Sequence, residues 1–383
     1  MKIDHLNVYK IQLPFSGDFS HSLRKGYSAK NIIIEIIADQ GKIVGYGEGA
    51  PRPYVTGETP ESAVSAITGL TGNHSFPWEL NDADQIWNLI DNLPDEKSNN
   101  SSICALETAL LDALAKQQKR YIMEYFPPAF LTDTINYGAV ISFGSRDRIM
   151  EIWQLINKLN LKKLRIKMGK NINKNKDTIE TVKALFGDDC DLRIDVNGAW
   201  NYQIALAHIP FIKKHKIKVV EQPMENSDKS IIKFAKEMKK SGVVLMADEL
   251  ACSMKDVNEI IREKYYGMIN IRLSKCGGFR RSLKIIEKIR ASGLSFQIGC
   301  QLGESGILSA AGRILGLLCR DAVYYDGSYD KFLLAENTTL EDVSFGPGGK
   351  AGPLEGPGLG VKVSSQKLEK LSNSEVITIN NPN

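Results

Sequence analysis

The chain has 383 residues, of which 43% are hydrophobic and 25% charged, and its formal net charge is +4. These fractions are typical of a soluble globular protein, and the near balance of basic and acidic residues indicates neither a nucleic-acid-binding nor a membrane-binding surface. No apolar run approaches the roughly 20 residues that span a bilayer, and the N-terminus lacks the apolar core of a signal peptide. The length exceeds that of one barrel of about 250 residues by roughly one small domain.

Residues 1–125 are expected to form an α+β unit. Apolar and polar residues first alternate with the period of a strand, and the pattern then changes to the period of amphipathic helices. Two prolines at 127 and 128 end this pattern and mark a boundary. The expected elements are strands at 3–13, 31–38 and 42–51 and helices at 61–69, 82–93 and 102–118.

From residue 126 to residue 326, strand-like and helix-like stretches alternate. Such alternation favours a parallel sheet, and eight strands favour closure into a barrel, so we expect an α/β fold of the modified TIM (β/α)7-8 type. A doubly wound open sheet is the alternative, but the glycine-rich segment 346–360 precedes no helix and makes a poor phosphate loop. The expected strands lie at 135–142, 163–168, 191–195, 217–221, 243–247, 267–272, 295–299 and 322–325.

Three acids close short apolar runs on consecutive expected strands. Asp195, Glu221 and Asp248 end the runs LRID, KVVE and VVLMAD and lie 26 and 27 residues apart. One acid at a strand end often caps the next helix, but three in a row are hard to attribute to capping. Parallel barrel strands deliver their carboxyl ends to one mouth, and an oxygen-only set suits Mg²⁺. We therefore predict a metal site, with Asn197 and Glu249 orienting the carboxylates.

Two basic residues end the second expected strand. Arg165 and Lys167 are two residues apart, so they point to the same side of the strand. A guanidinium beside Lys167 would lower the pKa of that amine by like-charge repulsion, as a general base near neutral pH requires. Two solvated charges are the plain alternative, and the three acids downstream argue against it.

The six cysteines are scattered and form no CxxC pair, which argues against a disulfide framework or a zinc knuckle. We therefore expect a reducing, cytoplasmic environment.

Seven short motifs follow one another in a fixed order from residue 105 to residue 361. They are ALETALLDALAK (105–116), RIK (165–167), DVNGAW (195–200), EQP (221–223), ADE (247–249), NIRLSKCGG (270–278) and PGLGV (357–361). Together they resemble the enolase superfamily, specifically its muconate-lactonizing-enzyme subgroup. The resemblance implies an α+β capping domain, built from residues 1–125 and the tail 327–383, that closes over a barrel at 126–326.

The resemblance also implies a chemistry. Mg²⁺, with Mn²⁺ as an alternative, would be held by the three acids, and Lys167 would remove the proton α to a substrate carboxylate to give an enediolate held by the metal. An α-proton beside a carboxylate is very weakly acidic, so the charge that develops needs a cation and the proton needs a positioned amine. The partner is thus a small carboxylate, and we expect a homo-oligomer.

Two departures from the family pattern bear on the reaction. The first lysine of the family's KxK motif is Arg165 here, which keeps the positive charge. The lysine that racemases of the subgroup use on the opposite face is Arg272, and arginine is a poor base because it stays protonated. Lys275, three residues later, could replace it only if the strand bulged. This favours one-base chemistry, such as cycloisomerisation or β-elimination, over two-base racemisation.

Substrate selection in the family comes from N-terminal loops and the end of the eighth strand. Here these are the segments 14–25 and 52–56, the first of which carries His21 and Arg24. The stretch GEGAPRPYVTGET (47–59) resembles dipeptide epimerases, which hold the substrate ammonium with two acids after the eighth strand. The expected substrate-binding residues are His21, Arg24, Tyr54, Gln301, Glu304, Asp326 and Asp330.

We therefore predict an enzyme of the isomerase or lyase type. The main reading is a cycloisomerase or epimerase acting on a small carboxylate or amino-acid derivative. The alternatives are a β-elimination lyase, such as a dehydratase or an enzyme like o-succinylbenzoate synthase, and a metal-dependent carboxylate-binding protein without turnover.

Overall fold

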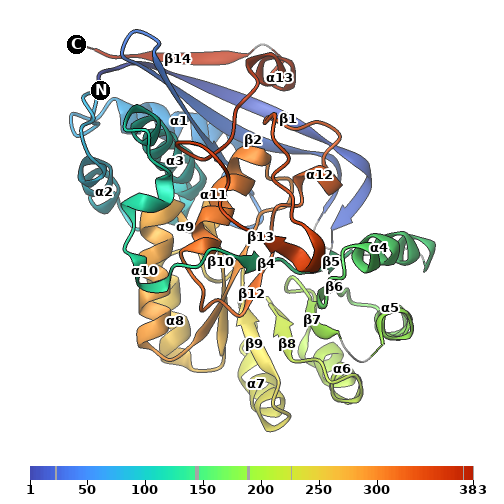
Figure 1. Cartoon of the computed structure of the whole chain (residues 1–383). Helices are drawn as coiled ribbons and strands as arrows, with labels where there is room; N and C mark the ends of the chain where they lie inside the picture. The colour runs from blue at the N-terminus through green and yellow to red at the C-terminus, as the bar shows by residue number, and fades with distance from the viewer. Residues whose placement is uncertain (22–23, 143–145, 188–189, 226, 374, 383) are drawn as a thin grey trace.

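The computed structural model describes residues 1–383 except 22–23, 143–145, 188–189, 226, 374 and 383, and it describes the side chains outside 17–26 and 148 (Figure 1). An antiparallel sheet lies at one end of the molecule and a parallel barrel at the other. The predicted fold, a (β/α) barrel with an α+β cap, is confirmed.

The antiparallel sheet contains both ends of the chain and has the order β14-β1-β2-β3. Pairing between β1 and β2 continues past an irregularity near Pro14, with Phe19 opposite Gly26, so the expected loop 14–25 is largely strand backbone. The longer hairpin reflects main-chain pairing that the side-chain pattern did not reveal. The strands are β1 Ile3–His21, β2 Arg24–Ala38, β3 Ile43–Gly49 and β14 Val376–Asn380.

Three glycines of β3 let helix α3 (Asn100–Gln117) lie directly on this sheet. A Cβ atom at Gly47 would lie 2.0 Å from the Ala105 carbonyl oxygen, and one at Gly49 would lie 2.2 Å from the Ser101 carbonyl oxygen. Real Cβ atoms do not come so close, so any larger residue would push the helix away. The other elements of this region are α1 Pro60–Thr71, α2 Ala83–Asp91, η1 Lys97–Asn99, η2 Ile122–Tyr125 and η3 Pro128–Phe130.

We expect Gly47→Val to lower the free energy of unfolding by about 3 kcal/mol, because the added methyl groups would collide with the α3 backbone. Urea denaturation followed by circular dichroism measures this change. Gly69→Ala is the matched control, since nothing lies near a Cβ at that position in α1 and alanine favours a helix. Equal stability of the two variants would contradict the close packing.

The parallel sheet curls into a barrel with the strand order β12-β11-β10-β9-β8-β7-β6-β5. A parallel bridge between Tyr137 and Tyr325 brings the two edges together, and the Gly138 amide donates to the Tyr325 carbonyl at 2.8 Å. The strands are β5 Ala139–Ile141, β6 Lys163–Lys167, β7 Asp191–Asp195, β8 Val219–Glu221, β9 Val244–Ala247, β10 Met268–Arg272, β11 Ser295–Gly299 and β12 Tyr324–Tyr325.

The single strand expected at 135–142 is divided into two. Its first part, β4 (Ile135–Asn136), pairs antiparallel with β13 (Lys350–Ala351) outside the barrel, and only β5 pairs with β6. Gly138 stands at the change of partner, where a Cβ would lie 2.8 Å from the Lys163 carbonyl oxygen. Ile135 of β4 and Ile141 of β5 are both buried, although they belong to different sheets.

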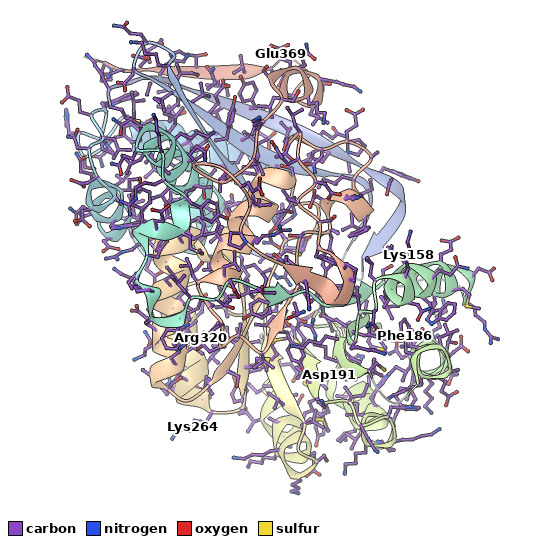
Figure 2. The ribbon with its side chains drawn as sticks, viewed as in Figure 1. Lys158, Phe186, Asp191, Lys264, Arg320 and Glu369 are labelled. Carbon is purple, nitrogen blue, oxygen red and sulfur yellow. The ribbon has the colours of Figure 1, made fainter. Side chains whose placement is uncertain are left out.

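Helices follow the barrel strands and cover the outside of the barrel (Figure 1). Charged side chains such as Lys264, after α8 (Met254–Glu263), and Glu369, on α13 (Ser365–Leu371), project outward at the edge of the molecule (Figure 2). Within the described part of the chain, no helix combines the length and apolar character of a membrane span. The helices are α4 Arg146–Lys158, α5 Ile172–Phe186, α6 Tyr202–Lys214, α7 Ile231–Lys240, α8 Met254–Glu263, α9 Leu273–Cys276, α10 Gly278–Ala291 and α11 Gly306–Leu317.

The C-terminal segment contacts the barrel before it returns to the antiparallel sheet. It contains α12 Asp330–Leu333, η4 Pro347–Gly349 and α13 Ser365–Leu371, and α13 packs near β1. The domain boundaries at 125 and 326 stay predictions.

The Glu48 carboxylate of β3 joins the antiparallel sheet to the barrel. It accepts hydrogen bonds from the amides of Ser305 and Leu308, both at 2.9 Å, at the start of α11. The Asn31 amide donates to it at 2.6 Å. A carboxylate at a helix N-terminus satisfies free amides and interacts favourably with the helix dipole, so the sheet is held directly over the barrel.

Candidate active site

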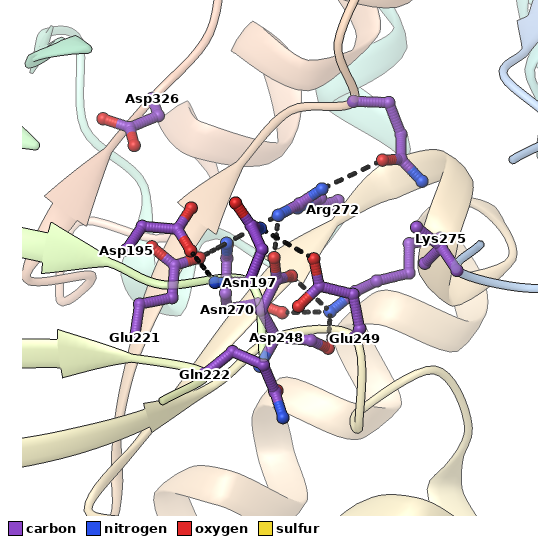
Figure 3. A network of polar contacts seen from close by, with 12 residues as sticks. Asp195, Asn197, Glu221, Gln222, Asp248, Glu249, Asn270, Arg272, Lys275 and Asp326 are labelled. Carbon is purple, nitrogen blue, oxygen red and sulfur yellow. Dashed lines mark hydrogen bonds and ion pairs between the residues drawn. The ribbon is translucent and has the colours of Figure 1, made fainter. Parts of the chain in front are cut away.

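The charged residues predicted to lie together end neighbouring strands of the barrel. The register sets Lys167 of β6, Asp195 of β7 and Glu221 of β8 side by side, and Asp248 follows β9 directly. The three acids are 0% exposed. They lie together at one end of the barrel (Figure 3).

Arg165 and Lys167 share one face of β6, and both contact these carboxylates. Arg165 NH1 lies 3.1 Å from Asp195 Oδ2 and 3.0 Å from Glu221 Oε2. Lys167 Nζ donates to Asp195 Oδ2 at 2.6 Å and to Asn197 Oδ1 at 2.8 Å. With exposures of 6% and 8%, these two residues are not solvated charges at a strand end.

The pKa values of Lys167 and Asp195 are both lowered in this cluster. Burial lowers the pKa of Lys167; the Asp195 carboxylate opposes this, and the Arg165 charge reinforces it. For Asp195, burial opposes ionisation, but the charges of Lys167 and Arg165 outweigh burial and hold its pKa below the usual value. The cluster thus keeps a carboxylate charged beside an amine that loses its proton more readily than a solvated lysine.

Arg272 lies across the mouth from Lys167. Its NH1 donates to Gln301 Oε1 at 3.0 Å, and its NH2 forms an ion pair with Asp248 (Figure 3). Lys275, by contrast, is fully buried, and its Nζ donates to the carbonyl oxygens of Asp248 and Asn270, each at 2.7 Å. The strand shows no bulge that would bring this lysine into the mouth in place of Arg272.

Both residues expected to orient the carboxylates contact the cluster. The Asn197 amide donates to Asp195 Oδ1 at 3.0 Å, and its side chain donates to Glu249 Oε1 at 2.9 Å. Burial, together with the charge of Asp195, raises the pKa of Glu249.

The acid trio fits a hard divalent cation by its chemistry. Three buried carboxylates supply only oxygen, the donor that Mg²⁺ prefers, and one oxygen of the neighbouring Glu249 receives no hydrogen bond. Among the described residues, however, no three His, Cys, Asp or Glu side chains converge on one point. Arg165 and Arg272 stand between the carboxylates, so an ion held by all three would take over contacts that these guanidinium groups now make.

A cavity of about 180 Å³ opens at this mouth. Lys167 and Arg272 line it, and three of the expected substrate-binding residues, Gln301, Glu304 and Asp330, line it with them. Burial raises the pKa of Glu304 to about 8. Much of the remaining wall is apolar, contributed by Ile152, Leu155, Ile156 and Leu159 of α4 and its end and by Phe332 and Leu333 of α12.

Two further expected substrate-binding residues, Tyr54 and Asp326, are not among the described residues that line this cavity. Asp326 pairs instead with Arg165 at 3.1 Å. His21 and Arg24 end the β1–β2 hairpin, and their side chains lie outside the described residues.

A polar layer beneath the acids was not predicted from the sequence. Arg193, Gln297 and Asn270 are all fully buried, and Asn270 donates to Glu221 Oε1 at 2.8 Å. A usable signal was present, because Arg193 precedes Asp195 by two residues and Asn270 precedes Arg272 by two, which places each pair on one face of its strand.

Comparisons with known proteins agree with this geometry. A family model described as Enolase C-terminal domain-like matches residues 151–367. The N-succinyl-L-Arg/Lys racemase of Bacillus cereus is 26% identical over 97% of this chain and 98% of its own length.

Solved structures show the same fold. The dipeptide epimerase of Cytophaga hutchinsonii, complexed with Mg and the dipeptide D-Ala-L-Val, has a TM-score of 0.84 at 23% identity, covering 99% of this chain and 100% of that one. The muconate lactonizing enzyme of Pseudomonas fluorescens, complexed with muconolactone, has a TM-score of 0.84 at 20% identity, covering 97% and 99%. The family model spans more than half of the chain, and the predicted resemblance is confirmed. The chain therefore belongs to the enolase C-terminal domain-like family of the enolase superfamily.

Proposed function

We propose that this protein is a Mg²⁺-dependent isomerase that removes the proton α to the carboxylate of an amino-acid derivative. The observation that carries the proposal is the position of Lys167, which lines the cavity while its Nζ lies 2.6 Å from the buried Asp195 carboxylate. The Bacillus cereus racemase and the Cytophaga hutchinsonii epimerase support this choice, since their names describe isomerisation of amino-acid derivatives.

Lys167 is the base in this proposal. Burial lowers the pKa of its amine, which raises the neutral fraction that can accept a proton. Arg165 fixes the amine's surroundings, because one guanidinium bridges Asp195 and Glu221 and adds a positive charge beside Lys167.

Asp195, Glu221 and Asp248 are the residues that would hold the metal, and Asn197 and Glu249 would orient them. Mg²⁺, when bound there, supplies the positive charge that offsets the second negative charge of an enediolate.

Arg272 serves as an electrostatic partner on the opposite side of the cavity. A guanidinium keeps its proton at any ordinary pH, so it stabilises an anion better than it transfers a proton. The guanidinium donates to the side-chain oxygen Oε1 of Gln301 at 3.0 Å. The backbone amide of Gln301 in turn donates to the Glu304 carboxyl at 2.6 Å. One base predicts that a proton leaves and returns on the same face. Lys275 has no part in proton transfer in this proposal.

Solvent exchange tests the proposal. The enzyme is incubated in D₂O with Mg²⁺ and a panel of dipeptides, N-acyl amino acids and simple carboxylic acids, and the α-position is followed by ¹H NMR. We expect deuterium uptake at the α-position from the face of Lys167, lost when EDTA removes the metal. Loss of configuration together with the uptake would identify an epimerase and would require a second proton donor on the opposite face, against the single base. A carboxylate that binds but never exchanges would show a binding protein without turnover, the alternative that Arg272 suggests.

A further inference from the structure

Asp326, the first acid after β12, lies between two buried arginines. Its Oδ2 is 3.1 Å from Arg165 Nε, and its Oδ1 accepts a hydrogen bond from Arg193 NH2 at 2.5 Å. The side chains of Asp326 and Arg193 are 0% exposed. This carboxylate therefore faces the interior of the barrel.

The charge of Asp326 is already matched. Among the described residues, Asp326 is the one ion-pair partner of Arg193, whose other guanidinium nitrogen NH1 donates to Gln297. Both arginines keep their charge at any ordinary pH. A substrate ammonium brought to Asp326 would therefore meet two fixed positive charges, and like charges repel strongly where water is excluded.

The two acids that do line the cavity are both buried and already accept hydrogen bonds from the protein. Burial raises the pKa of Asp330, and its Oδ2 accepts from the Asn337 amide at 2.5 Å. Glu304 has a pKa of about 8 because it is buried, so it is mostly neutral at pH 7. Two guanidinium cations, Arg165 and Arg272, line the same space.

We infer that Asp326 is the counter-ion of Arg165 and Arg193, and that the site therefore selects amino-acid derivatives whose nitrogen is acylated over those with a free ammonium. This inference rests on the proposed function. Asp326 would then determine specificity against a free ammonium, because its carboxylate is paired with the protein's own arginines.

A matched pair of ligands tests the inference. Binding of L-Ala-L-Leu and of N-acetyl-L-Ala-L-Leu is measured by calorimetry with Mg²⁺ at pH 6.5, where an α-amino group with a pKa of about 7.7–8.0 is protonated. We expect the acetylated ligand to bind at least tenfold more tightly. Equal or tighter binding of the free dipeptide, or no binding of either ligand, would overturn the inference. Binding with this preference but without α-proton exchange would contradict the proposed function alone.

Two variants show whether the arginines cause the preference. Arg165→Lys removes the Nε contact with Asp326, and Arg193→Met removes its second partner. Each variant should free the Asp326 carboxylate in part. The preference for the acetylated over the free dipeptide, given by the ratio of the two affinities, should therefore fall at least threefold. A merely structural role would weaken both ligands alike, and an unchanged ratio would overturn the inference.

Folding of each variant is checked by circular dichroism. If Arg193→Met fails to fold, Arg165→Lys decides the question, because it keeps the charge and most of the volume. Arg290→Lys, on an arginine that pairs with the partly exposed Asp321 away from the cavity, is the control and should leave the ratio unchanged.

Discussion

Lys167→Ala is expected to lower the rate of α-proton exchange by about 10³-fold, within the range attributed to general bases. The variant removes the amine that lies 2.6 Å from Asp195 Oδ2 and lines the cavity. Arg165 cannot take over proton removal, because its guanidinium stays protonated and is held by Asp195, Glu221 and Asp326. Exchange is measured by ¹H NMR in D₂O at saturating Mg²⁺ on whichever substrate of the panel exchanges fastest.

The same strand supplies a control. Lys163 begins β6 at the far end of the barrel, where its Nζ donates to the Val323 carbonyl at 2.9 Å. Lys163→Ala should exchange as fast as the wild type. If Lys167→Ala exchanged at a comparable rate, the base would have to be another residue and the proposed mechanism would be wrong.

Asp195→Asn is expected to weaken Mg²⁺ binding at least 100-fold, about 2.7 kcal/mol, because one of three charged ligands becomes neutral. The same variant should destabilise the metal-free protein by about 3 kcal/mol. Lys167 and Arg165 would each lose an ion-pair partner inside the barrel, and breaking a buried pair on one side is costly. Calorimetry measures the first effect, and urea denaturation in EDTA measures the second.

Asp191→Asn is its matched control, four residues earlier on β7. Asp191 lies at the opposite end of the strand, and its ion pair with Lys218 at 3.4 Å is partly exposed. Exposed ion pairs contribute little to stability, so Asp191→Asn should change the free energy of unfolding by less than about 1 kcal/mol. The Mg²⁺ affinity should stay that of the wild type. If Asp195→Asn bound Mg²⁺ as tightly as the wild type, Asp195 would not be a metal ligand.

Much of the barrel could be predicted because its signals are local. Each of β6 to β12 is a short strand-like stretch with buried apolar residues, and the near-constant spacing of these stretches implies a helix between successive strands. The same logic placed Lys167, Asp195, Glu221 and Asp248 at one mouth, since parallel strands end on the same side.

The rest depends on pairing between distant segments, which local patterns do not encode. The division of 135–142 follows from the backbone of β13, more than 200 residues away, and the apolar run itself gives no sign of it. Likewise, the sequence shows Asp326 and Asp330 only as a polar turn. Whether each acid faces the substrate or an arginine depends on Arg193, on a strand 133 residues earlier.

The charge pairing inside the barrel could not be foreseen for a related reason. The sequence indicated which carboxylates gather at the mouth, but each of them contacts a cation whose reach depends on side-chain conformation. Arg272 pairs with Asp248 and Gln301 in this way, from a position where the family motif has a lysine.

The pairing of β14 with β1 has a consequence for biosynthesis. His5 to Tyr9 lie opposite Val376 to Asn380, so the outer edge of β1 stays unpaired until residues 376–380 have been made. A growing polypeptide on the ribosome would carry an open strand edge during that time, and such edges invite pairing with other chains. Premature termination just before residue 376 should therefore yield a product that aggregates.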